Sequence, residues 1–149
     1  MNNFSLERIW EDVEFFEVEV IAKSEFIQAC GKFYTTTEKI DRLIASLSSF
    51  PQNSKDRFIW ENGVKGDKFT PYISLEFWCA EKFGHIVIEV YMEIDDGGSY
   101  DKHNCCFYIK TEVGLLNNFG KSLALLNERG IGRKITLNPE TLTCSAYAS

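Results

Sequence analysis

Alternation of apolar and polar residues is the clearest pattern in this chain, and it is strongest between residues 72 and 110. Residues 72–80 place apolar side chains on one face and a mixed set on the other. The first set is Ile73, Leu75, Phe77 and Cys79, and the second is Tyr72, Ser74, Glu76 and Trp78. Residues 85–95 and 103–110 alternate in the same way. A period of two is typical of a half-buried strand, so we expect an antiparallel meander of three strands.

Shorter runs predict further strands on either side of this meander. Residues 13–21 alternate from Phe16 onward, and residues 25–34 follow closely enough to form a hairpin with them. Residues 57–61 and 133–137 are expected to add short strands. The last stretch, 138–149, is polar with small residues, and we expect a loose C-terminal tail there.

Two segments have the apolar spacing of amphipathic helices. In residues 36–49 every third or fourth side chain is apolar, and Thr35 and Glu38 have the spacing of a capping box. Pro51 prevents this helix from continuing. Residues 112–129 repeat the spacing, and Gly130 is suited to a left-handed C-terminal cap.

A short sequence at the junction of strand and helix occurs twice. The segment 33–38, Phe-Tyr-Thr-Thr-Thr-Glu, returns at 107–112 as Phe-Tyr-Ile-Lys-Thr-Glu, and each copy leads into one of the two helices. We therefore predict an α+β fold with pseudo-duplicated strand-to-helix halves. Its expected architecture is an antiparallel twisted sheet with both amphipathic helices packed on one face, in a single domain over residues 1–149.

Composition and charge narrow the class of protein. A chain of 149 residues can bury about 70% of its unfolded surface as one domain. Its 22 acidic and 16 basic residues give a net charge of −6, which argues against nucleic-acid binding. No segment approaches the ~20 apolar residues of a membrane span, and the N-terminus lacks the pattern of a signal peptide. Five cysteines without a disulfide-scaffold spacing are typical of a reducing cytoplasm.

Catalytic and metal-binding motifs are weak. His103, Cys105 and Cys106 would supply one arm of a zinc site, but the second arm is missing, so we predict no metal and no cofactor. An enzyme hypothesis would use Cys106 as a nucleophile with His103 as its base, or pair His85 with Glu89.

A more distinctive set lies on the polar face of the predicted meander, where carboxylates alternate with tyrosine and tryptophan. Aromatic side chains provide anchor area in protein interfaces, and carboxylates attract a basic partner over a distance. The residues we expect to bind a partner are Tyr72, Glu76, Trp78, Glu89, Tyr91 and Glu93, with Tyr108, Glu17 and Glu19 nearby. Two alternatives stay open: the polar face serves solubility alone, or further strands cover its aromatic residues.

The order of these parts resembles the small WapI-type immunity proteins of bacterial polymorphic toxin systems. Segments like Phe33–Leu47 and Cys106–Leu126 flank a meander like Ile73–Ile94, and the similarity covers about residues 13–128. The resemblance implies a cytoplasmic, non-enzymatic protein that neutralises a cognate toxin domain by binding it.

We therefore expect a binding protein and not an enzyme. Its partner is expected to be a basic toxin domain that is occluded by the acidic and aromatic sheet face, with no role for nucleic acid or membrane. The chain is expected to be a monomer or a homodimer. The alternatives are the small Cys/His enzyme described above and a structural or regulatory homodimer joined through the same face.

Overall fold

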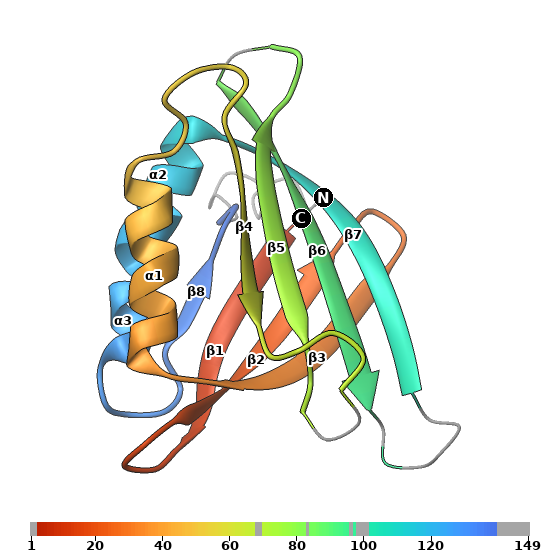
Figure 1. The fold of residues 1–149 in the computed structure, drawn as a ribbon, viewed down its shortest axis with the longest axis vertical. Helices are drawn as coiled ribbons and strands as arrows, with labels where there is room; N and C mark the ends of the chain where they lie inside the picture. The colour runs from red at the N-terminus through yellow and green to blue at the C-terminus, as the bar shows by residue number, and fades with distance from the viewer. Residues whose placement is uncertain (1–2, 68–69, 83, 96, 98–101, 140–149) are drawn as a thin grey trace, which may run out of the picture.

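The computed structural model describes residues 3–67, 70–82, 84–95, 97 and 102–139. Within these ranges, eight strands and three helices follow one another (Figure 1). They are β1 (Asn3–Glu11), β2 (Phe16–Lys23), β3 (Gln28–Thr35), α1 (Thr37–Ser48), β4 (Arg57–Asn62), β5 (Ile73–Cys79), β6 (His85–Asp95), β7 (Lys102–Glu112), α2 (Val113–Ser122), α3 (Ala124–Asn127) and β8 (Lys134–Thr136). No helix within these ranges is long and apolar enough to cross a membrane.

The described strands form two antiparallel sheets of four strands each. Sheet A has the order β3-β2-β1-β8, and sheet B has the order β4-β5-β6-β7. Each half of the chain runs through three strands, a helical segment and a fourth strand. That fourth strand joins the other half's sheet, because β4 pairs with β5 and β8 pairs with β1. The α+β class, the meander and the pseudo-duplicated halves are confirmed.

The arrangement of the layers differs from the single sheet expected. Sheet B crosses in front of sheet A in Figure 1, and the helices lie together along the side where β4 and β8 are the edge strands. Helix α1 contacts β4, whereas α2 and α3 contact β8. The helices therefore close the open side between two sheets. Alternation along a strand shows that one face is buried, but it does not show what covers that face.

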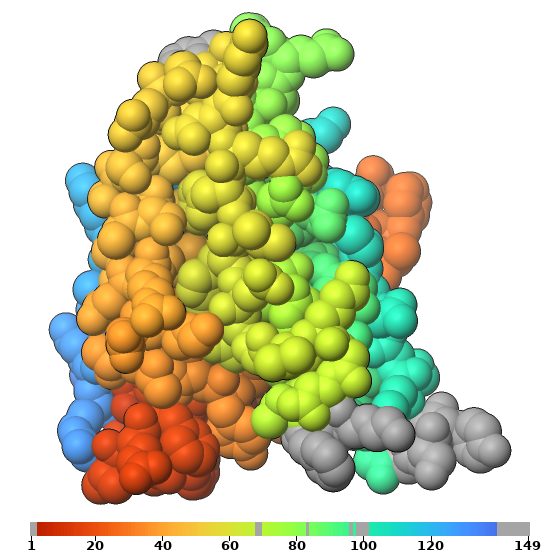
Figure 2. All heavy atoms as spheres, viewed as in Figure 1, coloured from red at the N-terminus to blue at the C-terminus, as the bar shows by residue number. Residues whose placement is uncertain are grey.

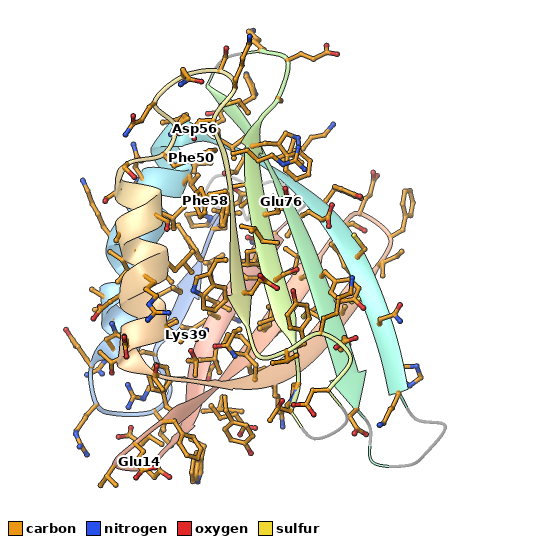
Figure 3. The ribbon with its side chains drawn as sticks, viewed as in Figure 1. Glu14, Lys39, Phe50, Asp56, Phe58 and Glu76 are labelled. Carbon is orange, nitrogen blue, oxygen red and sulfur yellow. The ribbon has the colours of Figure 1, made fainter. Side chains whose placement is uncertain are left out.

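The core lies between the inner faces of the two sheets and the helices. Its fully buried members include Val18, Val20, Leu43, Leu75, Val90, Ile109 and Leu126. The sheets approach closely where β3 passes β6, since a Cβ added at Gly31 would lie 3.2 Å from the Met92 Sδ. Phe50 and Phe58 point toward each other between α1 and β4 (Figure 3), with ring centroids 5.1 Å apart. Such aromatic pairs contribute about 0.5–1.5 kcal/mol beyond their buried area.

Several element boundaries differ from the expectation. Helix α1 is capped by Thr36, whose side chain accepts a hydrogen bond from the Lys39 N–H, because Thr35 is still paired in β3. The predicted helix 112–129 is divided at Leu123 into α2 and α3. Of the predicted tail, residues 140–149 lie outside the described residues. Its first residue, Asn138, is tied to β1 because its N–H donates to the Asn3 Oδ1 at 3.0 Å.

Candidate functional site

The predicted binding residues lie on the outer face of sheet B, which is turned away from sheet A. Five of them are on the neighbouring strands β5 and β6, beside Tyr108 on β7, and Tyr72 directly precedes β5. Glu76 is opposite Glu89, and Glu89 is opposite Tyr108. In the next row along, Tyr91 is opposite Cys106. Figure 2 shows the surface of this side of the molecule, to which α1, β4 and β5 contribute in gold to light green.

Trp78 is the centre of one aromatic group on this face. It is half-buried, and its ring meets that of Tyr108 edge-on with centroids 6.3 Å apart. The guanidinium of Arg57 lies 4.5 Å from the centre of the Trp78 ring and also donates a hydrogen bond to Glu76. That bond is the main reason why the pKa of Arg57 is raised. Arg57 therefore fixes the positions of both Trp78 and Glu76 (Figure 3 labels Glu76 on β5).

Tyr91 is the centre of a second group. Its hydroxyl donates to the Glu93 Oε2 at 3.2 Å, and the Lys65 Nζ lies 4.7 Å from the centre of its ring. The Glu93 Oε1 accepts the Gly66 N–H at 2.9 Å, so this carboxylate also orders the loop before β5. Burial, followed by the charge of Glu93, raises the pKa of the Tyr91 hydroxyl.

Tyr72 differs from the other five predicted residues because it is buried, with 4% of its surface exposed. Its hydroxyl donates to the Glu61 Oε2 at 2.7 Å, and its ring lies 5.9 Å from that of Tyr91. Burial, together with the Glu61 hydrogen bond, raises its pKa to about 12. Tyr72 therefore packs against the Tyr91 ring and offers almost no exposed surface to a partner.

The two carboxylates of Glu76 and Glu89 form the least favourable pair on the face. They are directly opposite each other on β5 and β6, a position where like charges destabilise a sheet. Arg57 bonds to one of them, Glu76, and acts on Glu89 through its charge. Both carboxylates are half-buried, so part of their hydration is already lost. The pair lies near Trp78 and Tyr108, where Arg57 and Lys110 on the same face offset part of its negative charge.

A groove of about 830 Å³ adjoins this face where β3 passes the ends of β6 and β7. Among the described residues that line it, five are carboxylates and two are lysines. The carboxylates are Glu17, Glu19, Asp67, Glu93 and Asp95. Glu93 thus belongs to both surfaces, and the acidic character of the outer face continues into the groove. The wall formed by β2 and β3 contains Glu17 and Glu19, which we expected near the face.

The pairs required by the enzyme hypothesis are separated. His103 and Cys106 point to opposite faces of β7 because they are three residues apart in a strand. His85 and Glu89 share a face of β6, but four residues of strand separate them by about 13 Å. Burial raises the pKa of the Cys105 thiol. Within the described ranges, no three His, Cys, Asp or Glu side chains are grouped as metal ligands.

Sequence reasoning missed the cations of the face and one whole aromatic group. Arg57 and Lys65 lie against the rings of Trp78 and Tyr91, and only the alternation in β4 pointed toward Arg57. The missed aromatic group is formed by Trp10, Phe15 and Tyr34 on sheet A. It depends on β1, which the pattern did not predict.

Comparisons with known proteins add no family to this description. No protein-family model and no curated protein matches the sequence, and no solved structure matches the fold. The structure defines an α+β protein with two four-stranded sheets, in which each half of the chain contributes its fourth strand to the other half's sheet. The geometry of the outer face is therefore the basis on which we infer its function.

Proposed function

We propose that this chain is a cytoplasmic binding protein that occludes a basic partner domain with the outer face of sheet B, as an immunity protein does with its toxin. The observation that carries the proposal is the Glu76–Glu89 pair beside Trp78 and Tyr108. A cation brought by a partner would relieve the repulsion between the two carboxylates. The adjacent rings would supply apolar contact at the same point.

The polar network of the face supports this role because it holds the side chains in place before a partner arrives. Arg57 fixes Trp78 and Glu76, while Glu93 joins Tyr91 to the loop at Gly66. Fixed side chains lose little conformational entropy on binding, so more of the contact free energy contributes to affinity. A face that served solubility alone would not require aromatic rings to be contacted by cations and held by a hydrogen bond.

The experiment begins with the gene next to that of this protein. The proposal expects it to encode a large secreted protein with a basic, toxic C-terminal domain. Co-expression of this chain should remove the toxicity, and the two purified domains should form a complex. The absence of such a neighbour, or a neighbouring domain that does not bind, would contradict the proposal.

Substitutions on the face then test which surface binds. Trp78→Ala should weaken binding by about 2 kcal/mol or more, because a central aromatic anchor is removed. Glu89→Lys should slow association and reduce its dependence on salt. Leu125→Ala is the matched control, because Leu125 is 43% exposed on the helical side. This substitution should leave the affinity and the association rate unchanged. Equal affinities and association rates for all three variants and the unmodified chain would exclude this face.

A further inference from the structure

In each half of the chain, the tyrosine of the repeated junction is exposed and contacts a tryptophan of the same sheet. In the repeated junction, Phe33 and Phe107 are buried, whereas Tyr34 and Tyr108 are 47% and 56% exposed. On sheet B, the ring of Tyr108 in β7 contacts that of Trp78 in β5. On sheet A, the ring of Tyr34 in β3 contacts that of Trp10 in β1. The centroids in these pairs are 6.3 Å and 6.1 Å apart. The proposed function uses only the pair on sheet B.

The group on sheet A is larger than its counterpart. Trp10, Phe15 and Tyr34 form a triangle in which each ring contacts the other two, with centroids 5.6–6.1 Å apart. All three remain substantially exposed at 43%, 36% and 47%, and Val13, in the segment between β1 and β2, is 84% exposed. A cluster of exposed aromatic rings in mutual contact is typical of an interaction site.

A β-bulge brings Trp10 to this surface. Arg8 is opposite Val18 and points inward, and Trp10 would share that direction in a regular strand. The register shifts between them, so Trp10 is opposite Glu17 on the outer face. Bulges are frequent where a strand must redirect a side chain for function. The chain therefore departs from regular pairing at a position that places a tryptophan outside.

The patch is continuous with the acidic groove. Glu17 lies between Trp10 and Tyr34 in the register, and both Glu17 and Tyr34 line the groove. Glu19 follows on the same face, and Glu93 and Asp95 line the wall contributed by β6. One end of the groove therefore offers rings and the rest offers mainly carboxylates. Arginine and lysine fit both, because they pair with carboxylates and stack on aromatic faces.

We propose that the groove and the Trp10–Phe15–Tyr34 patch bind an extended segment of the partner that is rich in arginine and lysine. This inference rests on the proposed function, in that the segment belongs to the same basic partner. It adds a second contact surface, reached through the groove from the outer face of sheet B. Charge complementarity selects this occupant, because the described groove lining has an excess of carboxylates.

A synthetic peptide tests the surface without the partner. The isotope-labelled full chain is titrated with a short peptide of alternating arginine and glycine, and NMR follows the amide and indole signals. We expect shifts at the Trp10 indole and at the amides of Glu17, Glu19 and Tyr34. A peptide of alternating glutamate and glycine should cause none. Shifts confined to sheet B, or no shifts, would overturn the inference.

Substitutions distinguish specific binding of the peptide in the groove from nonspecific electrostatic attraction to an acidic protein. Trp10→Ala and Glu17→Lys should each weaken the peptide's binding about tenfold. Glu38→Lys is the matched control, because it makes the same change in net charge on α1, where Glu38 is 77% exposed. The buried Trp60 indole signal, which should not change, reports that each variant is folded. Equal losses for Glu17→Lys and Glu38→Lys would overturn the inference.

Two further outcomes distinguish this inference from the proposed function. If Trp78→Ala weakens binding of the partner domain while Trp10→Ala does not, the second surface is excluded and the proposed function stands. If neither variant changes that affinity, both fail. A second copy of this chain is the other possible occupant of the patch, and light scattering tests for it. A dimer that Trp10→Ala dissociates would show that a second copy covers the patch, and this result would also overturn the inference.

Discussion

Arg8, in the first strand β1, contacts the C-terminal end of helix α3. It is 5% exposed, and its Nη1 donates to the Leu126 O at 2.7 Å and the Glu128 O at 3.0 Å. Its guanidinium also lies 4.0 Å from the centre of the Phe16 ring. These carbonyls are at the end of α3, where they have no partner within the helix. Arg8 therefore holds the C-terminal helix against sheet A.

We expect Arg8→Met to lower the free energy of unfolding by about 2 kcal/mol, because the buried Leu126 carbonyl oxygen loses its charged donor. Arg42→Met is the control, since Arg42 and its ion-pair partner Glu38 are 65% and 77% exposed. Such exposed helical pairs contribute about 0.3–0.5 kcal/mol. Urea unfolding of both variants measures the difference. Similar losses in the two would contradict the role given to Arg8.

The hydroxyl of Tyr72 should make stability fall at high pH. Its pKa is raised to about 12 in the folded state, whereas a tyrosine in the unfolded chain titrates near 10. Between these values the unfolded chain has lost a proton that the folded chain keeps, so the free energy of unfolding decreases as the pH rises. Below pH 10 the contribution is fully present.

Tyr72→Phe tests this assignment. In an ultraviolet absorbance titration of the folded protein, the variant should lose a tyrosine whose pKa is about 12. Its stability should also fall less steeply between pH 10 and 12 than that of the unmodified chain. An unchanged titration curve in Tyr72→Phe would show that the Tyr72 hydroxyl is not held by burial and Glu61.

At the scale of elements, alternation was sufficient to predict β2, β5, β6 and β7, and β4 was expected as a short strand. The first strand, β1, was missed for two physical reasons. An arginine, Arg8, occupies an inward position where the pattern requires an apolar residue, and the following bulge reverses the direction of Trp10. The burial of Tyr72 was also missed, because its tertiary partners Glu61 and Tyr91 lie on other strands.

The contact between α1 and α2 depends on the absence of a side chain at Gly120. A Cβ added there would lie 3.3 Å from the Leu47 Cβ, whereas one added at Gly114 in the same helix would meet open space. Alanine favours a helix over glycine by up to about 1 kcal/mol. We expect Gly114→Ala to stabilise the protein by about 0.5 kcal/mol and Gly120→Ala to destabilise it.

Thermal unfolding of these two variants provides the comparison. Both make the same chemical change in one helix, so their difference isolates the contact with Leu47. A higher midpoint for Gly114→Ala and a lower one for Gly120→Ala would support the close approach of the helices. Equal stabilisation by both substitutions would contradict it.

For the whole molecule, the repeated junction in the sequence corresponds to a repeated architecture. The halves exchange β4 and β8, so each sheet contains strands from both, and separation of one half would leave the other half's sheet incomplete. The exchange was not visible in the sequence, because alternation gives the face of a strand but not its neighbour. On each sheet the exposed tyrosine of the repeated junction contacts a tryptophan, but the two tryptophans occupy different register positions.

The central claim is that the outer face of sheet B binds a basic partner domain. Hydroxyl-radical footprinting of the purified complex tests it most directly, because it reports the solvent access of individual side chains. We predict that Trp78 and Tyr108 lose reactivity on binding, while Leu125 on the helical side keeps it. Full reactivity of Trp78 and Tyr108 in a saturated complex, with protection at Leu125 instead, would contradict the account.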